Sequence, residues 1–201
     1  MATSTRLLLL APGAGAPSSS SWMQAQKGRL EALGRVVTFD YPYMLEGRKS
    51  PDRAPVLIAA HEAALERASV GHVGPRVLVG KSMGGRLGCH VAVRATQKPA
   101  ALVCLGYPLV GQRGDVRDAV LLELETPVLF VQGTRDKLCP LERLEPVRAR
   151  MRAPHALHVV EGGDHSLVVG KRDLAARGLT QASVDAAVTQ AIAEFLAAHA
   201  C

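Results

Sequence analysis

The sequence predicts an α/β fold in which about six parallel strands form one sheet with helices on both faces. Short apolar runs recur along the 201 residues, and stretches with helical spacing of apolar residues separate them. The runs are continuous rather than alternating, as in strands that are buried on both faces. Such alternation of strands and helices favours a parallel sheet. The runs lie at residues 6–10, 36–39, 76–79, 101–105, 128–132 and 155–160.

The first run sets the expected order of the strands. If residues 6–10 form a central strand, the order across the sheet is 2-1-3-4-5-6, which reverses between the first and third strands. A crevice opens at the carboxyl ends of those two strands, where open α/β sheets bind ligands. The apolar part of this run is shorter than the hydrophobic region of a signal peptide. We therefore expect a strand here and no targeting segment.

The helical stretches carry apolar residues at i, i+3 and i+4 spacing. The clearest is the last, in which Val188 and Ile192 belong to one apolar face. Thr180 or Ser183 can cap its start, because a hydroxyl oxygen there accepts a bond from a backbone N–H of the first turn. Hydrophobic residues make up 48% of the chain and charged residues 21%, as is typical of globular proteins. We expect one domain over residues 1–201.

The charges and the cysteines argue against several classes of function. The net charge of +6 comes from 24 basic and 18 acidic residues that are scattered along the chain. The few aromatic residues do not interleave with the basic ones, as a surface for single-stranded nucleic acid requires. No apolar stretch reaches the ~18 residues of a membrane span. We expect neither a nucleic-acid nor a membrane partner.

The four cysteines show no metal-ligand spacing, so the sequence predicts no metal site and no cofactor. Cysteines of this kind suit reduced thiols, and we expect a cytoplasmic location.

The strongest functional motif is Gly80-Lys81-Ser82-Met83-Gly84. It follows the run at residues 76–79 and precedes a helical stretch, which is the setting of a nucleophile elbow. The chain turns sharply there, so a side chain two residues before or after the serine would collide with its surroundings, and both positions are glycine. A phosphate-binding loop is the alternative, but the lysine has the wrong spacing for one. We predict that Ser82 is a nucleophile.

A serine nucleophile needs an adjacent base, and His165 is the candidate. It lies in a loop beyond the last run and completes the order serine, acid, histidine that this type of fold uses. A merely exposed loop histidine is the alternative. The remaining histidines fall in helices, surface turns or the last strand; they are His61, His72, His90, His155, His158 and His199.

The predicted acid is Asp136, just past the run at residues 128–132, where it would orient His165 and stabilise the imidazolium. Asp40 also follows a strand, but it precedes the serine in the chain. Asp164 is adjacent to the histidine, and neighbouring side chains rarely point at each other. A helix cap or a salt bridge to Arg135 would be a purely structural role for Asp136.

Two backbone N–H groups should hold the oxyanion of the transition state. One belongs to Met83, the residue after the nucleophile. The other should come from the Gly-rich loop after the first strand, where we favour Ala14, with Gly13 and Gly15 as alternatives. A Gly-rich turn without a catalytic role is the structural interpretation of this loop.

These segments resemble the small lidless α/β hydrolases, in particular a bacterial family related to human testis-expressed protein 30 and to subunit 3 of the non-specific lethal chromatin complex. The matching segments lie in order along nearly the whole chain, at residues 39–44, 80–86, 105–109, 132–136 and 164–166. The resemblance implies a compact α/β-hydrolase fold and a triad that falls on Ser82, Asp136 and His165. Many relatives have His-Gly where this chain has Pro12-Gly13, but the donor expected there is a backbone N–H.

The sequence also bounds the substrate. Residues 106–127, where a cap domain is often inserted, are too short for an independent lid, so we expect an open site and no cap domain. A short-chain or small acyl ester or thioester fits such a site. Cys139 is expected to pack in the interior rather than to line the mouth. The expected apolar walls are Tyr43, Met83, Tyr107, Pro108 and Leu167.

Three functional hypotheses follow. The first is a serine hydrolase of the carboxylesterase or thioesterase type, acting on a small-molecule acyl substrate without metal or cofactor. The second is an interaction module, catalytically weak or inactive, on the same fold; an intact triad argues against it, because binding alone needs no triad. The third is nucleic-acid binding through the basic surface, which would give strongly salt-dependent binding.

Overall fold

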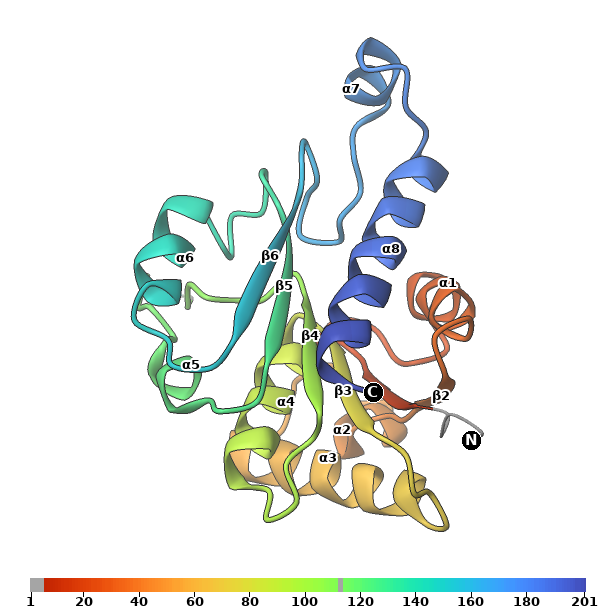
Figure 1. Cartoon of the computed structure of the whole chain (residues 1–201), viewed down its shortest axis with the longest axis vertical. Coiled ribbons are helices and arrows are strands. Elements are labelled where there is room, and N and C mark those ends of the chain that lie inside the picture. Colours follow the sequence, from red (N-terminus) through yellow and green to blue (C-terminus); the bar gives the residue numbers. More distant parts are fainter. Residues whose placement is uncertain (1–5, 112–113) are drawn as a thin grey trace.

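A sheet of six parallel strands forms the centre of the computed structural model, which describes residues 6–111 and 114–201 (Figure 1). Its order, β2-β1-β3-β4-β5-β6, confirms the predicted one. The predicted runs coincide with the strands apart from small shifts at their ends. The strands are β1 (Leu7–Ala11), β2 (Arg35–Thr38), β3 (Arg76–Lys81), β4 (Ala101–Leu105), β5 (Val128–Gly133) and β6 (His155–Val160).

Burial differs between the centre and the edges of the sheet. β1, β4 and β5 are buried along their whole length, as their continuous apolar runs predicted. The edge strands β2 and β6 are mostly half-buried, so the expectation of strands buried on both faces is wrong for these two. An edge strand has a neighbouring strand on one side only. Solvent therefore reaches the edge strands.

Helices cover both faces of the sheet (Figure 1). α1 and α8 pack on one face, and α3 to α6 pack on the other. Side chains of β1 alternate between the two layers, Leu8 and Leu10 toward α1 and α8, Leu7 and Leu9 toward the opposite layer. The helices are α1 (Ser21–Leu30), α2 (Pro42–Leu45), α3 (Ala54–Ser69), α4 (Met83–Arg94), α5 (Ala119–Glu123), α6 (Leu141–Arg148), α7 (Lys171–Ala176) and α8 (Gln181–His199).

The last helix, α8, has the predicted apolar face and cap. Val188 and Ile192 are buried against the sheet. Thr180 is the N-cap, and its hydroxyl oxygen accepts the N–H of Ser183 at 3.1 Å. The Ser183 hydroxyl in turn accepts the N–H of Thr180 at 3.1 Å. Both candidate residues thus take part in one capping box, which satisfies backbone donors of the first turn.

Within its described residues, the connection from β4 to β5 contains one helix, the short α5. In the parts of this connection that the structure describes, residues 106–111 and 114–127, no separate cap domain covers the sheet. The fold is therefore the compact α/β-hydrolase type that the sequence predicted.

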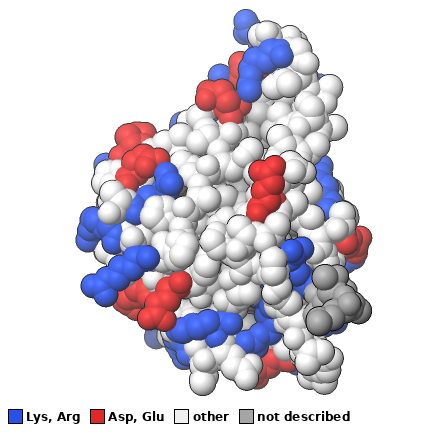
Figure 2. All heavy atoms as spheres, viewed as in Figure 1, with Lys and Arg blue, Asp and Glu red and all other residues white. Residues whose placement is uncertain are grey.

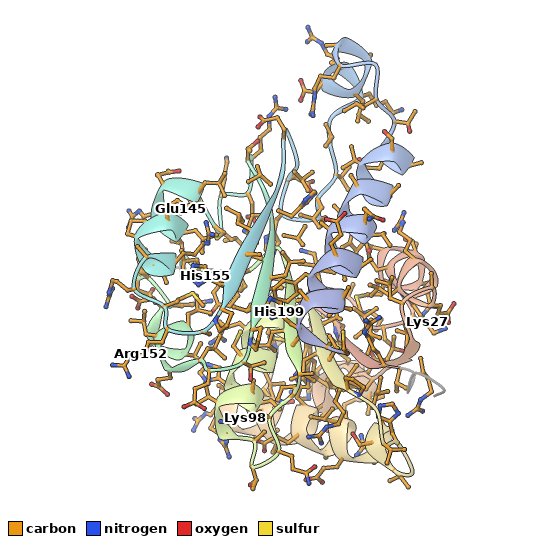
Figure 3. All side chains as sticks on the ribbon, in the orientation of Figure 1. Lys27, Lys98, Glu145, Arg152, His155 and His199 are labelled. Carbon is orange, nitrogen blue, oxygen red and sulfur yellow. The ribbon has the colours of Figure 1, made fainter. Side chains whose placement is uncertain are left out.

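Charged side chains of both signs are mixed around the rim of the face shown in Figure 2. The labelled side chains of Lys27, Glu145 and Arg152 lie at the periphery of the molecule (Figure 3). Among the helices of the described ranges, none combines the length and the apolar character that crossing a membrane requires.

Candidate active site

Ser82 lies at the sharp turn from β3 into α4, with φ 50° and ψ −116°. A positive φ is strained for a residue that has a side chain. Two backbone hydrogen bonds hold this conformation: the N–H of Ser82 donates to the carbonyl of Leu105 at 3.0 Å, and the N–H of Arg86 donates to the carbonyl of Ser82 at 3.1 Å. The serine is therefore fixed between a central strand and the start of a helix.

Gly80 and Gly84 make this turn sterically possible, as predicted. A Cβ atom on Gly80 would lie 2.2 Å from the amide nitrogen of Gly85. A Cβ atom on Gly84 would lie 2.6 Å from the carbonyl oxygen of Pro12. Both distances are far inside van der Waals contact, and in each case the obstacle is backbone that cannot swing away.

The side chains of Ser82, Asp136 and His165 lie together at the carboxyl end of the sheet. Nε2 of His165 is 2.8 Å from Oγ of Ser82, and Nδ1 of His165 is 2.8 Å from Oδ2 of Asp136. The Asp136 side chain is fully buried, whereas 29% of the His165 side chain is exposed. In this arrangement a neutral imidazole can accept the serine proton while it donates its own N–H to the carboxylate.

The two rival aspartates have other partners. Asp40 accepts the N–H of Ser18 at 2.6 Å and its hydroxyl at 3.1 Å. Oδ1 of Asp164 accepts the N–H groups of Ser166 at 2.7 Å and Val168 at 3.0 Å. Both carboxylates therefore shape their own loops, and neither reaches the imidazole.

Asp136 is held in place by its own turn. Its Oδ1 accepts the N–H of Leu138 at 2.9 Å, which leaves Oδ2 for His165. The salt bridge from Arg135 that would have given Asp136 a structural role is absent, because Arg135 instead pairs with Asp173 at 2.6 Å.

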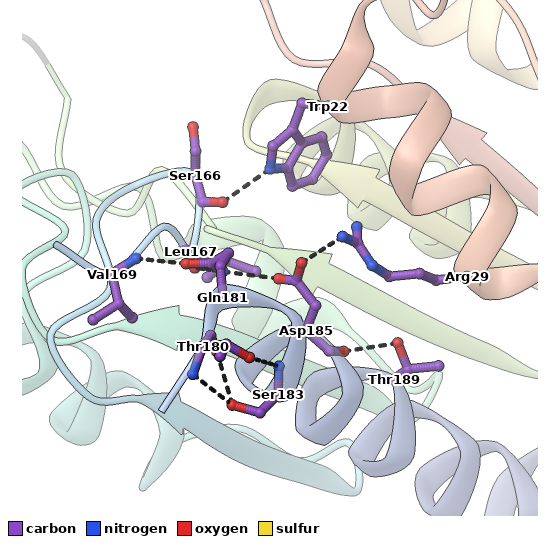
Figure 4. Close-up of polar contacts among 10 residues, drawn as sticks. All are labelled: Trp22, Arg29, Ser166, Leu167, Val169, Thr180, Gln181, Ser183, Asp185 and Thr189. Carbon is purple, nitrogen blue, oxygen red and sulfur yellow. Dashed lines mark hydrogen bonds and ion pairs between the residues drawn. The ribbon is translucent and has the colours of Figure 1, made fainter. Parts of the chain in front are cut away.

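The loop that carries His165 is held by side chains from distant segments (Figure 4). Nε1–H of Trp22 in α1 donates to the carbonyl of Ser166 at 2.9 Å. The Gln181 amide, in the first turn of α8, donates to the carbonyl of Leu167 at 3.1 Å and accepts a backbone N–H of the same loop at 3.0 Å. Leu167 itself has a φ of 63°, so this loop also holds a strained residue.

Lys81 is a site residue that the sequence analysis missed. Its ammonium donates to the carbonyl oxygen of His165 and lies 5.6 Å from the centre of the Trp22 ring. Burial lowers the pKa of this lysine to about 8, and the carboxylates of Asp136 and Asp164 oppose the shift only in part. The available signal was the period of the strand, because alternate residues of β3 face the layer that contains α1.

The loop after β1 is anchored from α2. The hydroxyl of Tyr43 donates to the carbonyl of Ala14 at 2.9 Å. Within residues 6–111 and 114–201, the N–H groups of Gly13, Ala14 and Gly15 donate no backbone hydrogen bond. Met83 is the first residue of α4, so its N–H has no acceptor inside the helix. These N–H groups can donate to an oxyanion; which residue of the loop does so remains a prediction.

A cavity of about 290 Å³ lies beside Ser82. The loop after β1, the start of α1, the end of β3 and the His165 loop form its walls. Among its lining residues are Gly13, Ala14, Trp22, Lys81, Ser82 and His165.

The five apolar walls expected from the sequence do not line this cavity. Tyr43, Met83, Tyr107 and Leu167 are buried in the core, Tyr107 edge-on against Phe130. Pro108 is also buried. The prediction failed because the sequence places whole segments at the crevice but does not show whether a given side chain points into the crevice or into the core.

Two further predictions concern cysteine and metal. Cys139 is fully buried in the core, as expected, and burial raises its pKa to about 12. In the part of the chain that the structure describes, no group of three His, Cys, Asp or Glu side chains is placed to hold a metal ion.

Known proteins share this architecture. A family described as alpha/beta hydrolase domain matches residues 4–197. A dienelactone hydrolase from Anabaena variabilis superimposes with a TM-score of 0.74 at 18% identity, covering 98% of this chain and 88% of that chain. Est1E from Butyrivibrio proteoclasticus, solved with bound ferulic acid, has a TM-score of 0.72 at 17% identity, covering 98% and 90%. Mouse alpha/beta hydrolase domain-containing protein 10 has a TM-score of 0.61 at 16% identity, covering 92% and 90%. At these identities the solved structures show the fold alone.

Proposed function

Because this chain belongs to the alpha/beta hydrolase domain family, we propose that it is a serine hydrolase that cleaves a small or short-chain acyl ester or thioester. The observation that carries the proposal is the pair of 2.8 Å contacts that link Ser82 to His165 and His165 to Asp136. They occur at a serine held with positive φ at a strand-to-helix turn, where the hydroxyl is presented to the crevice.

Acylation begins when Oγ of Ser82 attacks the substrate carbonyl carbon while Nε2 of His165 takes its proton. Asp136 stabilises the resulting imidazolium through Nδ1–H. The carbonyl oxygen becomes an oxyanion, which the N–H of Met83 and an N–H of the loop after β1, for which we favour Ala14, stabilise. The tetrahedral intermediate then collapses: the bond to the leaving group breaks, and that group takes the proton from His165.

Deacylation repeats these steps with water. Nε2 of His165 removes a proton from a water molecule, whose oxygen attacks the acyl carbon bound to Ser82. The second tetrahedral intermediate expels the serine, which recovers its proton from His165. The acid product leaves and the three side chains regain their starting protonation states.

The size of the site supports a small acyl group. A cavity of about 290 Å³ is at the lower limit of ordinary ligand pockets, and no cap domain extends it within the described part of the chain. We expect acetate and butyrate esters to be cleaved faster than long-chain esters. The opposite order of rates would contradict this part of the proposal.

Labelling with a fluorophosphonate probe tests the proposed nucleophile, because such probes react with an activated serine hydroxyl. The wild type, Ser82→Ala and Ser166→Ala are compared, with mass mapping of the adduct. Ser166 lines the same cavity, so its variant is the matched control. We expect an adduct on Ser82 in the wild type and in Ser166→Ala, and none in Ser82→Ala. A folded wild-type protein that is not labelled would contradict the proposal and favour the interaction module instead.

The proposal also includes the compartment in which the protein acts and the subgroup of the hydrolase family to which it belongs. We propose a cytoplasmic location, because the buried cysteines Cys89, Cys104 and Cys139 are not joined in disulfides. The motif segments around Ser82 and His165 support kinship with the testis-expressed protein 30 group within the hydrolase family.

A further inference from the structure

The cavity beside Ser82 is lined by positive charge without a compensating negative one. Among its described lining residues, Lys81 and His165 are the titratable side chains, and no Asp or Glu is present. The rest of the wall is small or apolar, or carries a hydroxyl group. A neutral acyl chain would need no ammonium at this position.

Lys81 is buried without a counterion. Its residue is only 9% exposed, and its contacts are one backbone carbonyl and the face of the Trp22 ring. None of the ion pairs among the described residues includes it. The carboxylates of Asp136 and Asp164, which attract the Lys81 ammonium, are already engaged, Asp136 with His165 and Asp164 with backbone N–H groups. Burying an unpaired ammonium is costly, and a bound anion would relieve that cost.

The ammonium has donors left for a ligand. A lysine carries three N–H donors, and the carbonyl of His165 uses one of them. The Trp22 ring attracts the cation through its electron-rich face and does not replace a hydrogen-bond acceptor.

Two helix N-termini add to the positive field. α1 and α4 both begin at this cavity, since Ser20 and Ser82 are their N-cap residues and both line it. Neither helix has an acidic residue in its first turn, and Ser20 makes no side-chain cap bond. The end of α4 serves the oxyanion in the proposed mechanism. Lys81 and the N-terminus of α1 are therefore available to bind a second negatively charged group of the substrate.

We propose that the acyl group of the substrate itself carries a carboxylate and that Lys81 recognises it. The substrate class is then a short dicarboxylic half-ester or half-thioester. This inference rests on the proposed function, because it names the substrate class of the same site. The space of about 290 Å³ limits the acyl chain to a few carbon atoms between the two carboxyl carbons.

The test compares two esters whose acyl chains have equal numbers of carbon atoms, monoethyl succinate and ethyl butyrate. Each competes with the fluorophosphonate probe for Ser82, and the concentration that halves the labelling rate is measured. Product acids are quantified in parallel by chromatography. We expect the anionic ester to protect Ser82 at about tenfold lower concentration, as a charge-assisted hydrogen bond in a buried site provides.

Variants assign the preference to Lys81. In Lys81→Met we expect the two esters to protect Ser82 equally, and in Lys81→Arg the anionic preference should persist in part. Lys98→Met is the matched control: Lys98 also donates to a backbone carbonyl, that of Val93, but it is exposed and does not line the cavity. The ratio between the two esters is the readout, so a general weakening of the His165 loop in the variant cancels.

The outcomes separate this inference from the proposed function. Labelling of Ser82 with equal protection by both esters in the wild type would overturn the anionic substrate class and leave the serine hydrolase intact. A preference that survives in Lys81→Met would overturn the role of Lys81. A folded protein without labelling would overturn the proposed function, and this inference with it.

Discussion

Oγ of Ser82 and Nε2 of His165 lie 2.8 Å apart, yet the segments that carry these two residues are held in place by different means. The serine turn is fixed by backbone: hydrogen bonds to Leu105 and from Arg86, and two glycines packed against main chain. The histidine loop is fixed by side chains, those of Trp22, Gln181 and Lys81, from three other elements.

The difference shows how one site combines backbone and side-chain constraints. A turn held by backbone hydrogen bonds and by glycines packed against main chain keeps its geometry as long as its glycines remain. A loop held by single hydrogen bonds from α1, β3 and α8 depends on how those elements pack, and each bond is worth only about 1 kcal/mol. We therefore expect substitutions at the serine turn to act on folding and substitutions around the histidine loop to act on catalysis.

The largest expected effect breaks the link between the two regions. Asp136→Asn should lower kcat by about 10⁴-fold with little change in thermal stability, because an amide cannot hold the imidazole in the productive tautomer. Asp164→Asn is the control, since its Oδ1 can still accept both backbone N–H groups. Comparable losses of kcat in both variants would contradict the assignment of the acid.

The next largest effect is expected at the serine turn, which is held by backbone contacts. Gly80→Ala should lower the free energy of unfolding by about 3 kcal/mol and abolish labelling of Ser82, because the new Cβ meets the Gly85 amide. Urea denaturation measures the loss. Gly28→Ala in α1 is the matched control: nothing lies near its Cβ position, so it should stabilise the helix by about 0.5–1 kcal/mol. A Gly80→Ala protein of wild-type stability would show that the turn can relax.

The pH dependence of stability tests Lys81, one of the side chains that hold the His165 loop. The pKa of Lys81 is about 8 in the folded protein, below its unfolded value of 10.5, so the unfolded chain binds more protons between these values. The free energy of unfolding of the wild type should therefore rise with pH from about 8 to 10.5, relative to Lys81→Met, by up to about 3 kcal/mol. Urea denaturation at several pH values measures the difference. Lys98→Met should show no such trend against the wild type, and a constant gap for Lys81→Met would refute the buried charge.

The smallest effect is expected from the loss of one side chain that holds the His165 loop, that of Gln181. Gln181→Ala removes both amide bonds to the His165 loop and should reduce kcat several-fold, with a stability loss of about 1 kcal/mol. Hydrogen exchange of the loop amides should speed up. Gln190→Ala, on an exposed turn of the same helix, is the control and should leave exchange in the loop unchanged. Equal exchange rates in the two variants would mean that Gln181 does not hold the loop.

The sequence predicted well what depends on residues close together in the chain. The apolar face of α8, its cap and the glycine pattern around Ser82 follow from local periodicity and sterics. The strand order followed from placing the first run at the centre of the sheet. The sequence also predicted that Ser82, Asp136 and His165 lie close together, because the carboxyl ends of parallel strands meet at one edge of the sheet.

Only the tertiary structure decided what fills the space around those side chains. It turned Tyr43 and Tyr107 into the core, although the sequence placed them at the cavity, and it put Lys81 under the His165 loop beside Trp22. The half-burial of β2 and β6 likewise depends on which strands lie at the edges. Local rules fix the direction in which the backbone runs, but the environment of a side chain depends on elements far away in the sequence. That is why the side chains of Ser82, Asp136 and His165 met as predicted, whereas Trp22 and Lys81 were not expected in the wall of the cavity next to them.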